Sequence, residues 1–286
     1  MGLDIGLVLS GGLAKGTYQL GALYALNEFI PPEHIKYISF ASIGALNGYA
    51  YASGNLDLVK KMWQNACCGE ERVNVVRLMK GKVLPAFIDK LVERSEPASS
   101  KLYCALYDHG NKKIVYRDLR SVEKETHADY LKASIAMPSI NKPVVVGGTS
   151  FYDGGVIDNI PVWPLMKHQL DYVICMYYDD STIKFENTLF DDKVIKITFP
   201  NISAFRESLY LHNDRVDSAI DAGYDRASFI LRTALAGGTE DLDSIYSAIG
   251  SMNRNLGKRK TRLSVDVIAS NLNKVTQKLV GKHILQ

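Results

Sequence analysis

The sequence predicts one α/β domain with a mainly parallel sheet and a helical C-terminal extension. In the first 50 residues, short apolar runs alternate with small-residue or glycine-rich turns and segments of helical spacing. This order is expected of parallel strands joined by right-handed helical crossovers. Two later apolar runs, residues 172–176 and 194–199, supply further strands, and residues 205–236 are strongly helical in composition.

The first elements follow directly along the chain. Residues 5–10, IGLVLS, are a short, partly β-branched run typical of a buried strand. The turn GGLAKG ends this strand, and residues 17–30 then show apolar positions at helical spacing. A second strand over residues 37–41 leads to Ser42 and another helix.

The later elements include a hairpin and a break near the C-terminus. KLYCALYD and KIVYRDL flank HGNK, a pattern that predicts two antiparallel strands joined by a turn. The AGG stretch at residues 236–238 interrupts the helical composition. We therefore expect a main domain over residues 5–235 and a helical extension over residues 236–286 packed on it.

Composition narrows the classes of function. The chain has 286 residues, 47% hydrophobic and 23% charged, which is ordinary for a soluble globular protein. A net charge of +3 is too small to indicate nucleic-acid binding. The four cysteines lack the spacing of a zinc site or a disulfide framework, which favours a reducing compartment.

The first residues lack the features of a signal peptide, and no run is long enough to span a bilayer. These observations together predict a cytoplasmic protein. The basic cluster GKRKTR, residues 257–262, is compatible with a solvated surface turn or with peripheral contact to anionic lipid headgroups.

Ser42 lies at a strand-to-helix corner, where a side chain is exposed at the carboxyl end of a sheet. The N–H groups of the following helix, and its dipole, would face whatever the serine attacks. Small residues after it, including Gly44, let that helix pack closely. Serine is also a favoured N-cap, so this segment alone is compatible with a structural role.

The SGGLAKG turn is the second candidate segment. A glycine-rich loop that opens a helix can aim several backbone N–H groups at one point, as stabilisation of an oxyanion requires. The same geometry could bind phosphate or be a plain tight turn. Lys15 precedes Gly16 rather than following it, which excludes a P-loop, and Leu13 replaces a glycine of the dinucleotide fingerprint.

The segment FYDGGVIDNIPV supplies a candidate base. A serine hydroxyl needs a group that takes its proton, and Asp153 lies on a turn followed by Gly154 and a second glycine. Asp-Gly turns are also common structural features. Asp158 is a second possible carboxylate, although DNIP is more typical of a structural loop.

None of the six histidines lies in a comparable small-residue turn. His168 and His212 are the histidines late enough in the chain for the α/β-hydrolase order, and their polar surroundings are typical of a surface. The residues therefore do not favour a Ser-His-Asp triad.

Four segments in this order resemble the patatin-like phospholipase family. They are the GGxAKG-type loop, the serine elbow, ASIAMPSI at residues 133–140 and the later DGG, with DAGYDRA at residues 221–227 as a further match. The resemblance implies a three-layer α/β sandwich and a Ser–Asp dyad that acts without histidine, metal or organic cofactor.

The resemblance also implies roles for individual residues and a substrate class. Ser42 would be the nucleophile, Asp153 the base, and the backbone of Gly11, Gly12 and Leu13 the oxyanion hole. Lys15, Gly16, Gly44 and Gly154 would support these loops. The implied reaction is hydrolysis of an acyl ester in a lipid, as by a phospholipase A, a lysophospholipase or an esterase.

Two residues depart from the family pattern. Phe40 occupies the position where the elbow G-x-S-x-G has its first glycine, and Leu13 replaces the third glycine of the loop. A positive φ at Leu13 would cost about 1–2 kcal/mol. These departures leave one alternative, a catalytically weakened lipid-binding or scaffold protein on this fold. A separate alternative is acyl transfer to an acceptor other than water.

Overall fold

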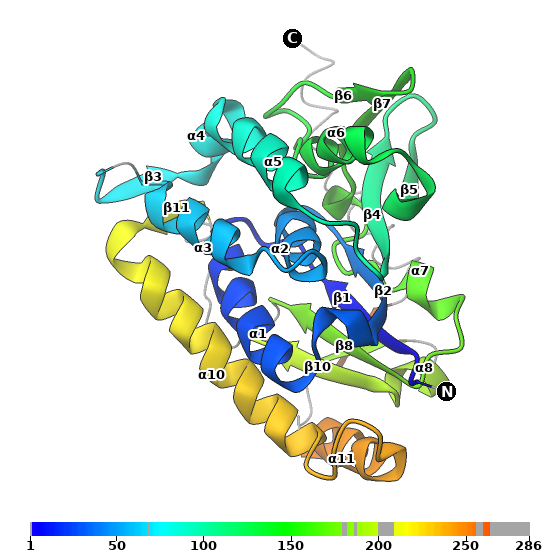
Figure 1. Cartoon of the computed structure of the whole chain (residues 1–286). Helices are drawn as coiled ribbons and strands as arrows, with labels where there is room; N and C mark the ends of the chain where they lie inside the picture. Colours follow the sequence, from blue (N-terminus) through cyan, green and yellow to red (C-terminus); the bar gives the residue numbers. More distant parts are fainter. Residues whose placement is uncertain are drawn as a thin grey trace.

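The computed structural model describes residues 2–67, 69–178, 182–185, 188–199, 209–255 and 260–263. Within these residues, the main feature is an eight-stranded sheet with the order β10-β8-β1-β2-β4-β7-β6, in which β5 also pairs with β4. Figure 1 shows this sheet running through the middle of the molecule with helices packed around it.

Parallel strands form one side and the centre of the sheet. They are β10 (Val194–Thr198), β8 (Tyr172–Tyr177), β1 (Ile5–Leu9), β2 (Ile35–Phe40) and β4 (Lys101–Asp108). Antiparallel strands complete it, namely β5 (Lys113–Asp118), β6 (Val144–Val146) and β7 (Thr149–Asp153). The predicted strands and the hairpin of β4 and β5 are confirmed.

Both faces of the sheet are buried. In β1, Leu7 and Leu9 belong to the larger core, whereas Val8 points to a smaller core on the opposite face. This is why β1 is apolar throughout instead of alternating. The structure therefore has the predicted three layers, with the sheet between two sets of covering segments.

The larger core is covered by most of the helices (Figure 1). They are α1 (Gly16–Phe29), α2 (Ile43–Ala52), α3 (Leu56–Asn65), α4 (Val75–Lys80), α5 (Val83–Arg94), α6 (Lys124–Ser134) and α10 (Val216–Ala234). The smaller core is covered by α7 (Trp163–Met166), its preceding segment, and Phe190 of α8 (Thr188–Asp191).

Helices α1 and α10 pack unusually closely because each carries a glycine at the contact. A Cβ on Gly21 would lie 1.8 Å from the carbonyl oxygen of Ile220, and one on Gly223 would lie 2.0 Å from that of Tyr18. Neither position has room for a methyl group. DAGYDRA therefore contains a helix-packing glycine.

Two short strands lie where helix was predicted. Within residues 205–236, Tyr210–His212 form β11, which pairs antiparallel with β3 (Arg72–Asn74), so α10 begins only at Val216. In the predicted helical extension, α11 (Leu242–Asn255) is helical, but β12 (Lys260–Leu263) pairs with β9 (Thr182–Phe185). Pairing with distant segments overrode local propensity at both places.

The basic cluster falls largely outside the described residues. Residues 257–259 are not described, and residues 260–262 are described only as backbone of β12. Peripheral membrane contact through this cluster therefore stays a prediction. None of the helices in the described ranges combines the length and the apolar run needed to cross a bilayer.

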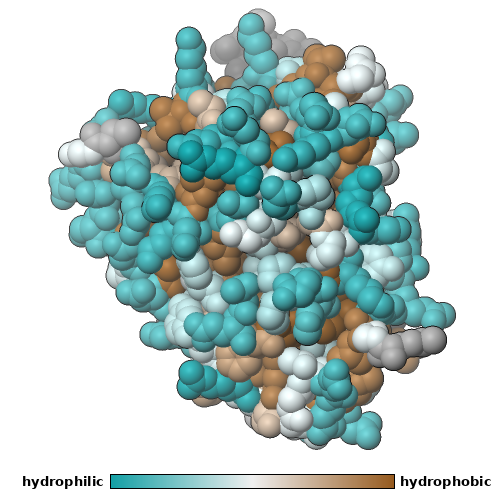
Figure 2. Space-filling model, viewed as in Figure 1, coloured by the Kyte–Doolittle hydropathy of each residue, from teal (hydrophilic) through white to brown (hydrophobic). Residues whose placement is uncertain are grey.

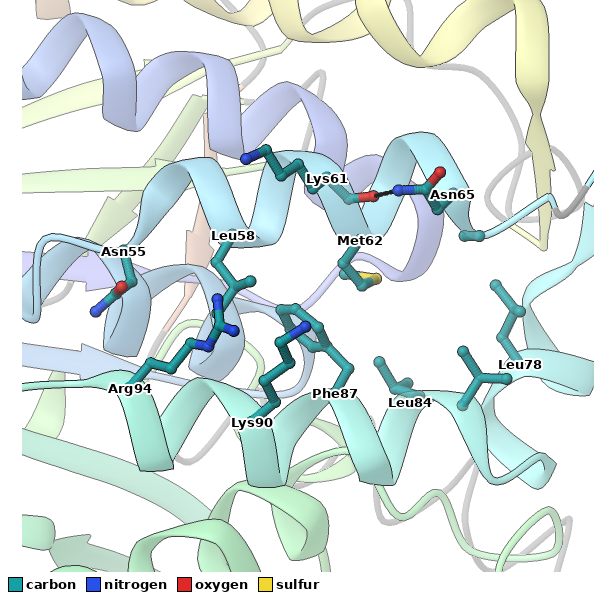
Figure 3. Close-up of a pocket in the computed structure, with 12 residues that line it drawn as sticks. Asn55, Leu58, Lys61, Met62, Asn65, Leu78, Leu84, Phe87, Lys90 and Arg94 are labelled. Carbon is teal, nitrogen blue, oxygen red and sulfur yellow. Dashed lines mark hydrogen bonds between the residues drawn. The ribbon is translucent and has the colours of Figure 1, made fainter.

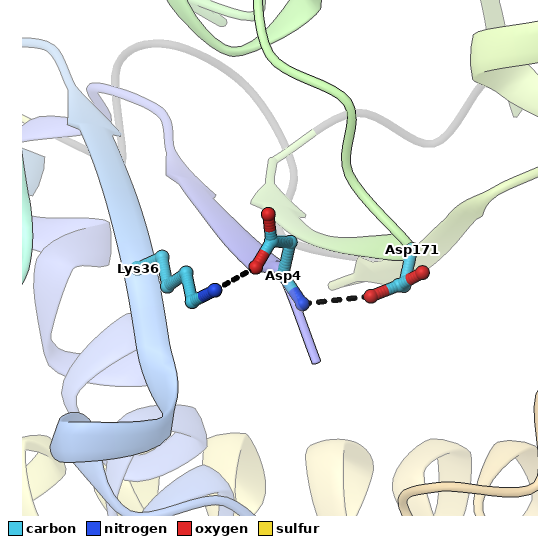
Figure 4. A network of polar contacts seen from close by, with 3 residues as sticks. All are labelled: Asp4, Lys36 and Asp171. Atoms are coloured by element: carbon cyan, nitrogen blue, oxygen red, sulfur yellow. Dashed lines mark hydrogen bonds and ion pairs between the residues drawn. The ribbon is translucent and has the colours of Figure 1, made fainter. Parts of the chain in front are cut away.

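Polar contacts join three strands at the amino-terminal edge of the sheet (Figure 4). Lys36 of β2 forms an ion pair with Asp4, which precedes β1. The N–H of Asp4 donates to Asp171 Oδ2 at 2.7 Å, and Asp171 directly precedes β8. These contacts hold together the starts of β1, β2 and β8, and they leave the carboxyl edge to carry the candidate site.

Candidate active site

Ser42 forms the tight turn between β2 and α2. Its backbone has φ 53° and ψ −132°, a conformation that a residue with a side chain adopts at a cost of about 1–3 kcal/mol. Ser42 occupies the N-cap position of α2, but its side chain makes no capping hydrogen bond. Capping therefore does not account for a serine here.

The elbow accommodates Phe40 because α2 carries a glycine opposite it. Phe40 is fully buried, and a Cβ on Gly48 would lie 2.8 Å from Cδ1 of its ring. The ring thus occupies space that a larger residue 48 would fill. Gly44 is needed separately, since its Cβ would lie 2.8 Å from the carbonyl oxygens of Leu9 and Ser10.

Asp153 ends β7 and is only 2% exposed. Its Oδ1 accepts a hydrogen bond of 2.7 Å from the N–H of Gly155. Burial raises the pKa of Asp153 to about 7, and the Ser42 hydroxyl and the Gly155 N–H beside the carboxylate limit the rise. A carboxyl group with this pKa can exchange protons near neutral pH.

The two glycines after Asp153 allow its turn to approach the neighbouring segments. A Cβ on Gly154 would lie 2.4 Å from the backbone carbon of Ala105 in β4. One on Gly155 would lie 3.0 Å from Asp153 Oδ1 and 3.5 Å from Ser42 Cβ. The DGG turn therefore brings Asp153 and Ser42 together, although 110 residues separate them in the sequence.

The segment ASIAMPSI also positions the aspartate. The N–H of Asp153 donates to the carbonyl of Ala136 at 2.8 Å. This bond fixes the end of β7 beside the loop that follows α6. The resemblance of residues 133–140 to the family therefore has a local structural explanation.

The glycine-rich loop lies against Ser42. A Cβ on Gly11 would lie 2.6 Å from Ser42 Cβ, and one on Gly12 would lie 2.3 Å from the ring of Tyr178. Leu13 adopts φ 54°, the strained conformation considered from the sequence. Gly12 and Leu13 begin the short helix η1 (Leu13–Lys15), so their N–H groups lack acceptors within that helix.

Lys15 and Gly16 join this loop to α1. Lys15 is the N-cap of α1, and its backbone N–H donates to the carbonyl of Gly12 at 3.1 Å. A Cβ on Gly16 would lie 2.7 Å from Cγ1 of Ile43. Gly16 thus lets the start of α1 approach the start of α2, beside Ser42.

Asn159 links the two loops, and the sequence reasoning did not single it out. Its Oδ1 accepts from the N–H of Gly11 at 3.1 Å, and its Nδ2 donates to the carbonyl of Gly11 at 3.2 Å. The backbone carbonyl of Asn159 also accepts from the same N–H at 3.3 Å. The N–H of Gly11 is therefore occupied. The position of Asn159 in DNIP, just after DGG, was the available signal.

The alternative acid and the histidines lie elsewhere in the structure. Asp158 accepts a hydrogen bond of 2.6 Å from Tyr116 Oη. His168 contacts Tyr103 Oη at 2.9 Å and stacks on Tyr37. His212 belongs to β11, and His283 lies outside the described residues. Within the described ranges, no histidine forms a hydrogen bond with Ser42 or Asp153.

A small apolar cavity of about 30 Å³ adjoins Ser42. Its walls come from the glycine-rich loop, α2, α3, α4, α5 and the end of α6, and they are apolar except at Ser42. The lining residues are Leu13, Ser42, Ile43, Met62, Trp63, Val75, Leu78, Met79, Leu84 and Ile135. The described residues contain no group of three or more His, Cys, Asp or Glu placed to hold a metal ion.

Comparison with known proteins identifies the family. The sequence model of the patatin-like phospholipase family matches residues 7–166, more than half of the chain. The chain belongs to the patatin-like phospholipase family. The matched part of this patatin-like chain contains Ser42, Asp153 and the glycine-rich loop.

Curated relatives of this patatin-like chain are much longer proteins. Lysophospholipase NTE1 of Cryptococcus neoformans is 27% identical over 184 residues, which are 60% of this chain and 11% of that protein. Lysophospholipase nte1 of Aspergillus terreus is 32% identical over 181 residues, or 58% of this chain and 11% of that protein. The match therefore spans about a ninth of these relatives.

Comparison with solved structures gives a match to VipD from Legionella pneumophila. It aligns with a TM-score of 0.49 and 13% sequence identity, over 99% of this chain and 77% of VipD.

Proposed function

We propose that this protein hydrolyses the acyl ester of a lipid with Ser42 as nucleophile and Asp153 as base. The observation that supports this most directly is the buried carboxylate of Asp153 beside the Ser42 hydroxyl, with its pKa raised by burial to about 7. Membership of a phospholipase family and the strained elbow at Ser42 agree with this proposal.

The first half of the reaction forms an acyl-enzyme. The Asp153 carboxylate takes the proton of the Ser42 hydroxyl while Oγ attacks the ester carbonyl carbon. The carbonyl oxygen becomes an oxyanion, and the N–H groups of Gly12 and Leu13 stabilise it. Protonated Asp153 then gives its proton to the leaving alcohol as the carbon–oxygen bond breaks.

The second half of the reaction releases the carboxylic acid formed from the acyl group. Asp153 takes a proton from water, the resulting hydroxide attacks the acyl-enzyme, and Asp153 returns the proton to Ser42 Oγ. No proton is gained or lost by the enzyme over the cycle. Gly11, predicted from the resemblance as a third oxyanion donor, has its N–H bonded to Asn159. We therefore assign it a positioning role beside Ser42.

A lysophospholipid is the first substrate to test, because the curated relatives are named lysophospholipases. Acyl transfer to another acceptor would use the same first half-reaction. Analysis of products formed with candidate acceptor alcohols distinguishes transfer from hydrolysis. The lipid-binding alternative depended in part on Phe40 disrupting the elbow. Phe40 is instead buried against Gly48, so this argument for an inactive protein is weaker.

A fluorophosphonate probe and an acyl-ester assay test the dyad together. The probe should label Ser42, as located by peptide mass spectrometry, and Ser42→Ala should lose both labelling and hydrolysis. Asp153→Asn keeps the shape of the side chain but removes the base. Its hydrolysis should fall by about two orders of magnitude or more, the usual contribution of general-base catalysis.

Histidine variants are the matched controls. His168→Ala and His212→Ala should retain rates close to the wild type, because neither side chain forms a hydrogen bond with Ser42 or Asp153. A folded Asp153→Asn variant with the wild-type rate, together with an inactive histidine variant, would show that the base is misassigned.

A further inference from the structure

A long groove lies between α3 and α5, with α4 at one end (Figure 3). It encloses about 600 Å³, within the usual range for small-molecule sites. Its floor is apolar and consists of Leu58, Met62, Leu78, Val83, Leu84 and Phe87. Figure 2, viewed as in Figure 1, shows hydrophobic residues between hydrophilic ones over these helices.

The groove arises from the spacing of side chains on its two helices. On α3, Leu58 and Met62 are four residues apart, and on α5, Val83 and Phe87 are four residues apart. Residues at this spacing share one face of a helix. Each helix buries another face in the core, through Val59 and Ile88 for example. Leu58, Met62 and Phe87 are only partly buried against the core, so part of their apolar surface faces the groove.

The groove is adjacent to the cavity at Ser42, and the two spaces share part of their walls. Met62, Leu78 and Leu84 line both the groove and the small cavity. They stand between the two spaces, and the methionine side chain is unbranched and adapts readily. A movement of these side chains would join the groove to the Ser42 hydroxyl without a change in the backbone.

Charged side chains occur at the far end of the groove. Figure 3 shows Lys90 and Arg94 extending from α5 across the groove toward α3, whereas the Lys61 ammonium points away from it. Long basic side chains can cover apolar surface with their stems while the charged ends stay in water. Lys90 and Arg94 thus extend the apolar wall toward the solvent.

We propose that this groove holds the acyl chain of the substrate, with the ester carbonyl at Ser42 and the tail running toward Arg94. This inference rests on the proposed function and adds a preference for long, unbranched chains. From Leu84 to Arg94, α5 rises about 15 Å at 1.5 Å per residue. The apolar lining, the wall shared with the Ser42 cavity and the length of the groove all match an extended hydrocarbon chain.

The test compares short and long p-nitrophenyl esters on variants that fill the groove. Leu58→Trp should lower kcat/KM for 12-carbon and 16-carbon esters by about tenfold, equivalent to about two lost buried methylenes. Hydrolysis of the four-carbon ester should stay within about twofold of the wild type, since a short chain does not reach Leu58. Lys60 does not line the groove and lies over the Tyr24 ring of α1, so Lys60→Trp places the same ring on α3 outside the groove and should leave both rates unchanged.

A second variant avoids the core altogether. Val83 is 58% exposed, so Val83→Glu does not threaten folding, yet it puts a charge in the groove. It should also lower the rate selectively for long chains. If folded Leu58→Trp and Val83→Glu both kept the wild-type chain-length profile, the groove would not be the acyl-chain site.

Binding to an inactive protein separates this inference from the proposed chemistry. In a Ser42→Ala background, the fluorescent fatty acid cis-parinaric acid should bind, and added Leu58→Trp should weaken binding by about tenfold. Binding unaffected by Leu58→Trp would overturn the groove assignment while leaving the dyad intact. Loss of short-ester hydrolysis in His168→Ala, with Asp153→Asn still active, would instead overturn the proposed function.

Discussion

Two strained residues with side chains, Ser42 and Leu13, line the same cavity. Strain of this kind is concentrated at active sites because the surrounding structure must enforce it. At Leu13, the positive φ costs about 1–2 kcal/mol, but burial of the side chain contributes about 1.5–3 kcal/mol. With only 9% of Leu13 exposed, burial outweighs the strain. A leucine is therefore tolerated where the family has glycine.

The raised pKa of Asp153 predicts the pH dependence of hydrolysis. In the proposed mechanism Asp153 acts as the base and must be ionised, and a carboxyl group is ionised above its pKa. Since burial raises this pKa to about 7, kcat/KM should increase as the pH rises from 5 toward 7 and should level off above it. The measurement is kcat/KM for a short acyl ester between pH 5 and 9, corrected for spontaneous hydrolysis.

Asp153→Asn supplies the control for this profile. Its residual rate should lack the rise near pH 7, because the titrating group is absent. A wild-type rate that is already constant from pH 5 would mean that Asp153 ionises at an ordinary pKa. It would also mean that burial does not raise the pKa of Asp153.

At the scale of elements, glycines determine how the helices and strands meet. Gly48 gives space to Phe40 between α2 and β2, while Gly21 and Gly223 let α1 and α10 approach to backbone contact. Local sequence predicted the order of β1, α1, β2 and α2 because glycine and apolar periodicity signal those boundaries directly. Elements that depend on remote partners, such as β11 with β3, gave no local signal.

The same distinction between local signals and remote contacts applies to the candidate site. Ser42, Asp153 and the loop could be located because each lies in a short segment that resembles the family. Asn159 could not, since its role depends on contact with Gly11, 148 positions away. The occupied N–H of Gly11 follows from this same contact. Phe40 looked disruptive because the compensating Gly48 is recognisable only once α2 is packed on β2.

Gly223→Ala should destabilise the protein, contrary to the usual effect in a helix. Replacing glycine by alanine in a helix interior normally stabilises it by about 1 kcal/mol. Here the new methyl group would lie 2.0 Å from the carbonyl oxygen of Tyr18, so α10 must move away from α1. Overpacking of this kind costs about 1–3 kcal/mol, which should appear as a lower urea midpoint.

Asp225→Ala is the matched control, because residue 225 is exposed on the same helix and alanine is a better helix former than aspartate. Its urea midpoint should be equal to or above that of the wild type. If Gly223→Ala were as stable as this control, the contact between α1 and α10 would be looser than the structure indicates.

At the scale of the whole molecule, the two edges of the sheet carry different groups of residues. Contacts among Asp4, Lys36 and Asp171 hold its amino edge, whereas Ser42 and the glycine-rich loop lie at the carboxyl edge. Helix α11 lies away from that site at the lower end of α10 in Figure 1. Its Ile245 and Ile249 are fully buried within the larger core. Helix α11 therefore contributes buried side chains to the larger core.

Substitutions in α11 should consequently change stability without changing chemistry. Ile245→Ala and Ile249→Ala each remove a buried side chain, which costs about 2–5 kcal/mol. In a chain of this size each kcal/mol corresponds to a fall in Tm of about 2–4 °C. At a temperature where the variants remain folded, kcat/KM for a short ester should equal that of the wild type, since neither residue lines the Ser42 cavity. Ser247→Ala, at an exposed position of the same helix, should leave both Tm and the rate unchanged. Wild-type Tm values for both isoleucine variants would indicate that α11 does not contribute to the core.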